Sequence, residues 1–433
     1  MKNTKFTILP LLAVMGLPVF ALPAAAEVHP AHSRVDVKAI GGEPSDTVRI
    51  YETFAENSPT SYHIPDAPRF AIVGKDRKFY LGIGGQVKGV ALFDWGDPIQ
   101  NPDEFVTSAI PMNKTPGNGG ELQMTARQSG LFVNFVALPD NPNKVGVFMA
   151  ANLIGSGDNY SFNLQYAYVK YRGFTIGYDY TLFGDMGAAI PTIDYEGPNS
   201  FTAFPNAVVD YRHNFGKFQI GVGAELPTAS YTTGDHTSTV SQRVPDIPAY
   251  VQYSWTSGSW IRFSALMRNM AYRDLVAGKN NTATGWGVKV SGTTAMSSPL
   301  RAYWQVAYGK GMTSYFQDLY DEGLDMVPDS DSPGKLDMVK SWGGYFGLQY
   351  NFSSKVYSSV AYSHVRNYFD SYKGGTTPWG EQYKYAQYAV GNVIYNVNSI
   401  FSCGLEYLWG RRVDMSGLSH HDNRIQAMVQ VTF

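Results

Sequence analysis

The final residues of the chain, NRIQAMVQVTF from Asn423 to Phe433, decide the fold. Polar side chains alternate there with apolar ones, which occupy positions Ile425, Ala427, Val429, Val431 and Phe433. A period of two is the pattern of a β-strand with one apolar and one polar face. A soluble β-sandwich or propeller could contain such a strand, but it would need a second apolar layer to cover the apolar face.

The same alternation recurs along most of the chain from Phe79 onward. It predicts sixteen strands, at residues 79–96, 121–137, 144–154, 160–172, 174–184, 206–215, 217–226, 246–256, 259–272, 284–296, 299–311, 341–352, 354–367, 382–396, 399–412 and 422–433. Some strands are separated by two or three residues, whereas others are followed by long polar stretches such as 227–245 and 312–340. An even strand count, with short turns at one end and long loops at the other, is typical of an antiparallel transmembrane β-barrel of the bacterial outer membrane. Closure into a barrel also satisfies the backbone groups of every strand edge, which a lipid environment requires.

The first part of the chain differs from the barrel. Lys2 and Lys5 precede an apolar run that ends in small residues, so residues 1–26 are expected to be a signal peptide. A single membrane anchor is the alternative, but the run is short and is interrupted by Pro10 and Pro18. Residues 27–78 are rich in Pro, Ser and charge and are expected to form a periplasmic lead-in. Residues 79–433 are expected to form the barrel, whose last strand should pair with the first near Phe79.

Composition excludes several classes of function. Charged residues make up only 16% of the chain and its net charge is −2, so no basic excess points to nucleic acid. The single cysteine, Cys403, excludes an intramolecular disulfide framework. The sequence contains no G-x-S-x-G, HExxH or paired-cysteine motif, so neither an enzyme nor a metal or cofactor site is expected.

The charged residues on the polar face of the strands suggest what the lumen favours. Most of them are basic, namely Lys88, Arg127, Arg212, Arg262, Arg268, Lys289, Arg301, Arg412 and Arg424. The acidic ones are fewer, namely Asp94, Asp179, Asp210 and Glu406. A confined lumen lined by arginine favours anions, and guanidinium groups suit carboxylates. We expect Arg127, Arg212, Arg262 and Arg301 to carry most of this preference. The alternative is that these arginines pair with lumen acids and only stabilise the barrel.

Two irregular segments interrupt the pattern. Residues 181–206, TLFGDMGAAIPTIDYEGPNSFTAFPN, are too irregular for a strand and too apolar for a solvated loop. We expect this segment to fold into the lumen as a constriction loop and to bring Asp185, Asp194 and Glu196 towards the basic wall; an extracellular cap is the alternative. Within 121–137 the alternation slips by one position, which a bulge or burial against a neighbouring subunit would explain.

Two motifs resemble a known family. The stretch LQYAYVKYRGFTIGYDYTLFGDMGAAIPTIDYEGP, Leu164 to Pro198, and the terminal GLEYLWGRRVDMSG with the following NRIQ are similar to the DcaP-like outer-membrane porins. Tyr180-Thr181 departs from the Trp-Ser often found there, and a Pro-rich lead-in replaces the helical N-terminal segment of some members.

The resemblance implies a homotrimer of sixteen-stranded channels in the outer-membrane lipid of a Gram-negative bacterium, passing small anionic solutes including dicarboxylates. Chains of this kind end on an aromatic residue, so Phe433 is expected to be the signal for the outer-membrane assembly machinery. The alternative function is a structural or surface-interaction barrel whose loops bind a partner.

Overall fold

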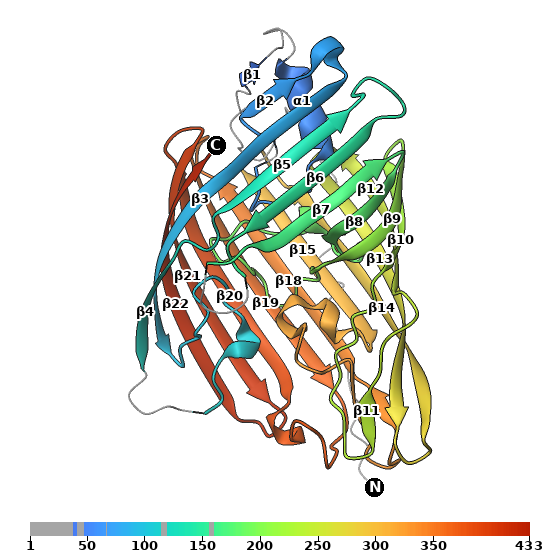
Figure 1. The fold of residues 1–433 in the computed structure, drawn as a ribbon. Coiled ribbons are helices and arrows are strands. Elements are labelled where there is room, and N and C mark those ends of the chain that lie inside the picture. Colours follow the sequence, from blue (N-terminus) through green and yellow to red (C-terminus); the bar gives the residue numbers. More distant parts are fainter. Residues whose placement is uncertain (1–37, 41–46, 66, 114–118, 156–159) are drawn as a thin grey trace, which may run out of the picture.

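An antiparallel sheet that closes on itself forms the wall of the protein (Figure 1). The computed structural model describes residues 38–40, 47–65, 67–113, 119–155 and 160–433, so the expected signal peptide lies outside the described residues. Within this part of the chain, sixteen wall strands confirm the predicted count when β4 and β5 are taken as one interrupted strand. They are β3 (Phe79–Gly96), β4 (Gly120–Thr125), β5 (Gly130–Ala137), β6 (Val145–Asn152), β7 (Asn163–Tyr171), β8 (Phe174–Tyr180), β9 (Pro205–Phe215), β10 (Phe218–Glu225), β12 (Ile247–Thr256), β13 (Ser259–Asp274), β14 (Lys279–Ala295), β15 (Leu300–Lys310), β18 (Lys340–Asn351), β19 (Val356–Tyr368), β20 (Tyr383–Asn396), β21 (Phe401–Asp414) and β22 (Ser419–Thr432).

The last strand closes the barrel against the first, as the sequence predicts. Strand β22 pairs with β3 from Asp422 opposite Gly96 to Thr432 opposite Gln86. The backbone of Phe433 continues this seam, because its N–H donates to the Gly85 carbonyl at 2.9 Å. The apolar positions of β22 face outward and the intervening polar positions face the interior, which is the arrangement expected of a strand between lipid and lumen.

The slip in the alternation at 121–137 is an interruption of the wall. Strand β4 ends at Thr125 and β5 begins at Gly130, and both pair with β3. Residues 126–129 leave the ladder, so the alternation restarts on the other parity and Leu131 and Val133 face outward. A local interruption therefore explains the slip without a neighbouring subunit.

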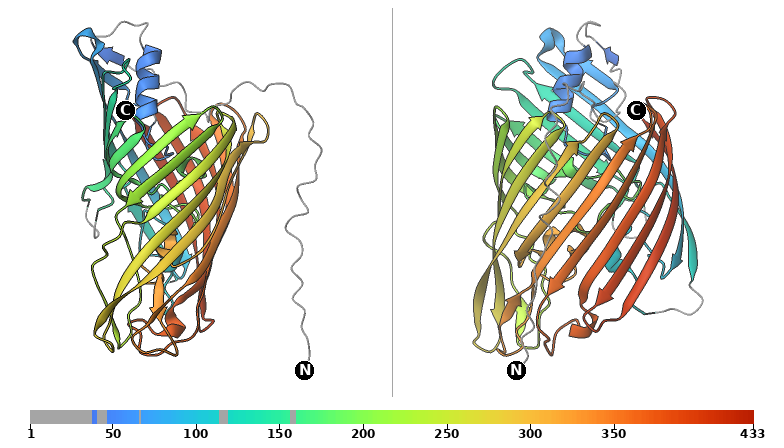
Figure 2. Two further views of the ribbon diagram at one scale, coloured as in Figure 1. Left: turned by 90° about the vertical axis from the view of Figure 1, so that its right-hand side faces the viewer. Right: turned by 180° about the vertical axis from the view of Figure 1, so that it is seen from behind.

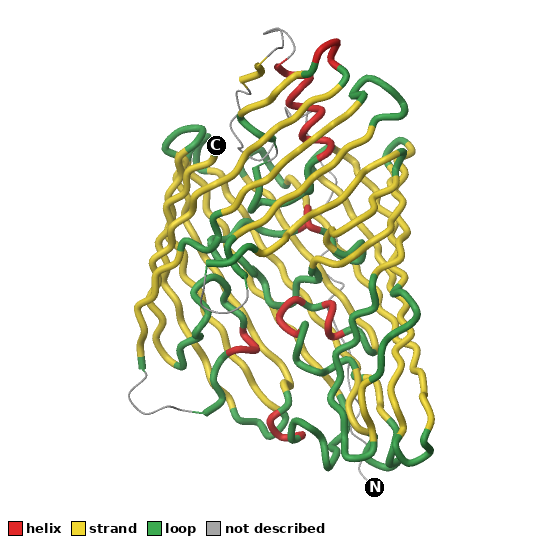
Figure 3. The backbone as a smooth tube through the Cα atoms, in the orientation of Figure 1, coloured by secondary structure: helices red, strands yellow, loops and turns green. Residues whose placement is uncertain are grey.

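The two ends of the barrel differ in their connections (Figure 3). Connections at the end that carries the C-terminus are short, such as residues 172–173 and 257–258. Longer segments connect the strands at the opposite end, such as residues 226–246 and 311–339. Short turns mark the periplasmic end of such a barrel and long loops mark the extracellular end. No helix among the described residues is both long enough and apolar enough to cross a membrane.

The lead-in contains regular structure that the sequence analysis did not predict. It contains β1 (Lys38–Ile40), α1 (Thr47–Asn57) and β2 (Phe70–Val73), and Figure 2 shows α1 and β2 at the periplasmic end of the barrel. Strand β2 pairs with β3 and so extends the wall. The helix buries Ile50 and Phe54, four residues apart on one face, in a cluster with Val136 of β5. This apolar stripe is too short to stand out among the prolines and charges around it.

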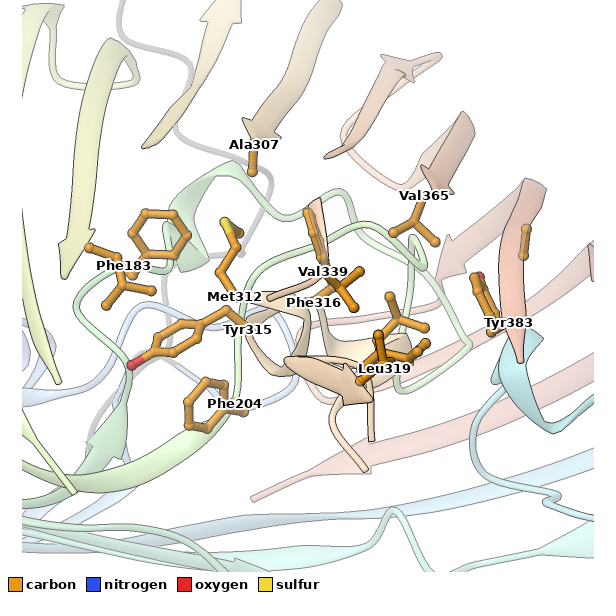
Figure 4. Packing of buried hydrophobic residues seen from close by; sticks show 14 of the residues in the cluster. Phe183, Phe204, Ala307, Met312, Tyr315, Phe316, Leu319, Val339, Val365 and Tyr383 are labelled. Carbon is orange, nitrogen blue, oxygen red and sulfur yellow. The ribbon is translucent and has the colours of Figure 1, made fainter. Parts of the chain in front are cut away.

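Long loops fill much of the lumen from the extracellular end. These loops contain the short strand β11 (Thr237–Thr239) and the strand pair β16 (Met326–Pro328) and β17 (Leu336–Met338). They also contain the short 3-10 helices η3 (Thr107–Ala109), η4 (Met186–Ala188), η5 (Thr313–Tyr315), η6 (Gln317–Leu319) and η7 (Trp379–Glu381). One more 3-10 helix, η2 (Lys75–Arg77), lies in the lead-in. Figure 4 shows Phe183 and Phe204 of one loop packed near Tyr315 and Met312 of another. The stretch 312–340, which is polar overall, therefore has a first part whose apolar side chains are buried in the lumen.

Candidate functional site

The segment between β8 and β9, residues 181–204, crosses the lumen as the predicted constriction loop. The wall holds it by hydrogen bonds to its backbone: Gln305 Nε2 donates to the Ser200 carbonyl at 2.8 Å, and Asn392 Nδ2 to the Pro191 carbonyl at 3.0 Å. The Glu406 carboxylate accepts the N–H groups of Ile193 and Asp194, each at 2.8 Å. Because these partners lie on β15, β20 and β21, the loop is fixed across the barrel and does not cap it from outside.

Two acidic residues of the loop lie close to basic ones, as predicted. The Asp185 carboxylate lies 3.6 Å from the Arg262 guanidinium and accepts hydrogen bonds from Ser291 at 2.8 Å and Trp260 at 3.1 Å. Asp194 accepts the Tyr388 hydroxyl at 2.9 Å, and Arg424 and Lys88 lie near its side of the lumen. Asp185 is thus the loop acid most directly opposed to a basic wall residue.

The prediction for Glu196 is wrong. The charged groups that act on its carboxylate are Asp318, Asp194 and Glu104, all of them acidic. Burial, and then these like charges, raise the pKa of Glu196 well above its usual value. Glu196 lies in a pocket with Glu104, Tyr320 and other residues, none of which is basic.

A cavity on the periplasmic side of the loop collects three basic side chains. This basic chamber has a volume of about 230 Å³ and is lined by Lys170, Arg212, Arg262 and several tyrosines, among them Tyr168 and Tyr250. Arg262 donates to Gln252 Oε1 at 2.9 and 2.7 Å and stacks over the Tyr250 ring at 4.2 Å. Its guanidinium group is therefore held in one orientation towards the chamber.

The other two basic groups of the chamber differ in how far they are neutralised. Arg212 lies 3.1 Å from the Asp210 carboxylate and 3.4 Å from that of Asp179. Lys170 Nζ donates to the Asn57 carbonyl at 3.0 Å, and no carboxylate of the described residues lies within ion-pair distance of it. Among the described residues, Lys170 thus has no ion pair, Arg262 has one and Arg212 has two, so Lys170 and Arg262 are the less neutralised charges of the chamber.

A second cavity on the periplasmic side contains Lys88. This Lys88 cavity, of about 180 Å³, lies between the lead-in residues Tyr62 and His63 and the wall strands β20 to β22. Lys88 Nζ donates to the Ile193 carbonyl of the constriction loop at 2.9 Å. Both cavities thus end at the same loop, and lead-in residues border both: Ser58, Pro59 and Thr60 line the basic chamber, and Tyr62 and His63 line the Lys88 cavity.

The lead-in is attached to the constriction loop inside the lumen. The Tyr62 hydroxyl and Thr192 Oγ1 are 3.0 Å apart, and His63 Nε2 lies 3.1 Å from the Tyr195 carbonyl. The His63 ring also stacks on that of Tyr195, with centroids 4.4 Å apart. Burial, and then the positive charge of Lys88, hold the pKa of His63 well below its usual value, so this ring is neutral.

Two arginines predicted to line the pore do not do so. Arg268 pairs with Asp246 at 2.9 Å and Asp325 at 3.0 Å, and Arg424 pairs with Asp94 at 2.7 Å. Both side chains are buried between the wall and the inward loops, so no solute reaches them. Arg268 and Arg424 therefore fit the alternative interpretation of the lumen arginines, in which they pair with acids and stabilise the barrel.

The remaining predicted residues lie apart from the two cavities. Arg127 lies 3.3 Å from Asp103, and Arg412 interacts with Glu322 and the Ser108 carbonyl. Lys289 is buried against Thr202 of the constriction loop, and Arg301 donates to the Gly258 carbonyl near a periplasmic turn. The structure therefore brings together Arg212 and Arg262 from the predicted set, and places Lys88 in the neighbouring cavity.

Sequence reasoning missed Lys170 and the lead-in residues. Lys170 lies on the inward face of β7, at an alternate position from Tyr166 and Tyr168. Assigning the residues of this strand to its two faces from the sequence would therefore have identified it. Tyr62 and His63 lie in an irregular Pro-rich segment, and nothing in the sequence shows that this segment enters the lumen. Among the described residues, no group of three or more His, Cys, Asp or Glu could hold a metal ion.

Comparison with known proteins agrees with this architecture. The model of a porin subfamily matches residues 133–428. The structure of the outer membrane channel DcaP of Acinetobacter baumannii superimposes with a TM-score of 0.70 at 21% identity, covering 83% of this chain and 99% of that chain. OmpT of Vibrio cholerae superimposes with a TM-score of 0.52 at 11% identity, covering 83% and 100%.

A complex of Salmonella typhi OmpF with daunomycin also superimposes, with a TM-score of 0.52 at 12% identity, covering 82% and 98%. No curated protein matches the sequence. At these identities the solved structures establish the fold, whereas the subfamily match covers more than half of the chain. The chain therefore belongs to the porin family and is an outer-membrane channel protein of the DcaP-like fold.

Proposed function

We propose that this porin lets small anionic solutes, dicarboxylates among them, diffuse across the outer membrane. The observation that carries the proposal is the basic chamber, in which Lys170 and Arg262 face a space of about 230 Å³ beside the constriction loop. A guanidinium group fixed by Gln252 and Tyr250 can donate a charge-assisted hydrogen bond to a carboxylate without further ordering of its side chain. A lysine nearby would hold the second carboxylate of a short diacid.

The acids around the chamber favour a weak site, as a channel needs. Asp179 and Asp185 lie close to Arg212 and Arg262, so they lower the attraction for an anion without abolishing it. A solute must bind well enough to enter and weakly enough to leave. The two acids therefore support diffusion through the chamber more than tight binding in it.

Solute uptake into proteoliposomes tests the proposal. We expect succinate to enter faster than a neutral sugar of similar size, and Lys170→Gln with Arg262→Gln to slow succinate more than the sugar. Glutamine keeps hydrogen-bonding capacity and removes the charge. Lys335→Gln, which removes a charge from an outer loop, is the matched control and should leave the ratio unchanged. Equal slowing of both solutes by the double variant would contradict an anion preference.

A structural or surface-interaction barrel is the second candidate function. The extent to which the loops fill the lumen favours it, since Phe183, Tyr315 and Phe316 are all fully buried there. Single-channel conductance in planar bilayers separates the two functions, because a barrel closed by its loops passes no current.

We also propose that the protein forms a trimer through the part of the wall that includes β5 to β8. The strands there are short, and the aromatic side chains Tyr160 and Phe162 beside them are 59% and 76% exposed. Native mass measurement in mild detergent tests this proposal, and a monomer under conditions that preserve the barrel would contradict it.

A further inference from the structure

The pocket around Glu196 lies on the extracellular side of the constriction loop. It has a volume of about 310 Å³ and borders Glu104 of the first loop, Glu196 of the constriction loop and Tyr320 of the loop after β15. None of the residues that line this Glu196 pocket is basic. The pocket thus differs in charge from both cavities on the periplasmic side.

Glu196 is the acid of this region whose side chain lacks hydrogen-bond donors. Asp194 accepts the Phe105 N–H at 2.9 Å, Asp318 accepts the Thr107 hydroxyl at 2.7 Å, and Glu104 accepts Asn101 Nδ2 at 3.1 Å. Both carboxylate oxygens of Glu196 are buried and have no hydrogen-bond partner among the described residues. A buried polar group without a partner costs free energy, so a native structure usually supplies one.

The rest of the pocket is aromatic. Its lining includes Tyr178, Tyr180, Tyr195, Phe204 and Tyr320. The faces of such rings carry negative electrostatic potential and attract cations, most strongly where water is excluded. A carboxylate that lacks donors and a set of aromatic rings therefore favour the same kind of ligand.

We propose that the Glu196 pocket binds an organic cation whose ammonium or guanidinium group meets the Glu196 carboxylate and contacts the aromatic rings. The charge of the ligand replaces the missing donors and relieves the repulsion among Glu104, Asp194, Glu196 and Asp318. Two sources can supply such a group: a free solute at the extracellular entrance, or a basic side chain from a second copy of this chain. The proposal does not depend on the anion preference of the channel.

Protons compete with the cation in this pocket. Burial, and then repulsion from Asp194, raise the pKa of Glu104 to about 7, while the hydrogen bond from Asn101 and the positive charge of Arg127 oppose the shift. Burial raises the pKa of Asp318 to about 6, while hydrogen bonds from Thr107 and Tyr383 oppose the shift. Cation binding is therefore expected to be stronger at pH 8 than at pH 5.5, where Glu104 and Asp318 are largely protonated.

Calorimetric titration of the purified full-length protein with choline tests the proposal. We expect saturable binding at pH 8 that is about tenfold weaker at pH 5.5, and about tenfold weaker in Glu196→Gln. The neutral isostere 3,3-dimethyl-1-butanol should not bind. Asp331→Asn, which removes an acid from an exposed loop, is the matched control and should bind choline like the unmodified protein.

The oligomeric state separates the two sources of the cation. If choline does not bind but Glu196→Gln converts the oligomer to monomers in native mass measurement, the cation is a basic side chain of a second copy. If choline binds and the oligomer is unaffected, the cation is a free solute. The proposal is overturned if neither effect is seen, or if the neutral isostere binds as tightly as choline.

Discussion

Arg424 and Asp94 join the last strand of the barrel to the first, with Arg424 Nε 2.7 Å from Asp94 Oδ1 and Nη2 3.0 Å from Oδ2. Their side chains are 1% and 0% exposed, and Arg424 also donates to the Asn101 carbonyl of the first loop at 2.8 Å. The pair therefore fixes both the closing seam and the loop beside it.

Removing one partner of this pair should destabilise the barrel. Arg424→Gln leaves the Asp94 carboxylate buried without a counter-charge, which costs about 3–5 kcal/mol in comparable cases. Combining it with Asp94→Asn should recover a large part of the loss, because no isolated charge remains. Urea unfolding of the refolded protein in liposomes measures both effects. Arg243→Gln in an exposed loop is the control, and equal stability of the single and double variants would contradict the coupling.

Truncating the lead-in side chains inside the lumen should raise conductance. Tyr62 and His63 border the Lys88 cavity and contact the constriction loop, so Tyr62→Ala with His63→Ala widens the periplasmic side of the passage. Single-channel recording measures the change. Val48→Ala, on the exposed side of α1, serves as the control within the same segment. Unchanged conductance in the double variant would show that the lead-in does not restrict the flow.

The acids of the Glu196 pocket should make the protein less stable as the pH rises. The pKa of Glu104 is raised from 4.5 to about 7, so its protonated form is favoured in the folded state. The contribution to stability is complete below pH 4.5 and is lost as the pH rises through about 7. Melting temperatures of the unmodified protein should therefore fall between pH 5 and pH 8, and Glu104→Gln should flatten this dependence. A steeper fall in Glu104→Gln would contradict the assignment.

Labelling of intact cells should confirm which end of the barrel faces outward. An epitope inserted at Asp331, which is exposed in the loop between β15 and β18, should bind antibody on intact cells. The same epitope at Asn141, in the exposed turn between β5 and β6, should bind only after the outer membrane is opened. Both epitopes lie outside the wall strands, so neither disturbs the barrel. The reverse labelling pattern would overturn the orientation.

The wall was predictable from the sequence because lipid and lumen impose an alternation on nearly every strand. Ile425 and Val429 are exposed on the outer face, and Gln426 between them is buried, as the period of two requires. The constriction loop was predictable for a related reason, since a segment as apolar as 181–206 needs to be covered. The slip in the alternation at Leu131 marks a real interruption of the wall between β4 and β5, although the sequence could not distinguish an interruption from a subunit contact.

The partners of the lumen charges were not predictable in the same way. Parity places Arg268 on the inner face, but its partner Asp325 lies in a loop whose path depends on packing by Tyr315 and Leu324. The prediction for Glu196 was wrong for a related reason, because its acidic neighbours Asp318 and Glu104 lie on other loops, whose paths the sequence does not show. Helix α1 was missed because its apolar stripe, Ile50 and Phe54, spans little more than one helical turn.

The reversal potential in a salt gradient tests the central claim, anion preference through the basic chamber, most directly. Lys170 and Arg262 are the chamber charges that acids neutralise least, so they should dominate the selectivity at the constriction loop. We expect the unmodified protein in a planar bilayer to give a reversal potential of the sign for anion preference, and Lys170→Gln with Arg262→Gln to move it towards zero or cation preference. A cation-selective unmodified protein, or a double variant with an unchanged reversal potential, would contradict the account.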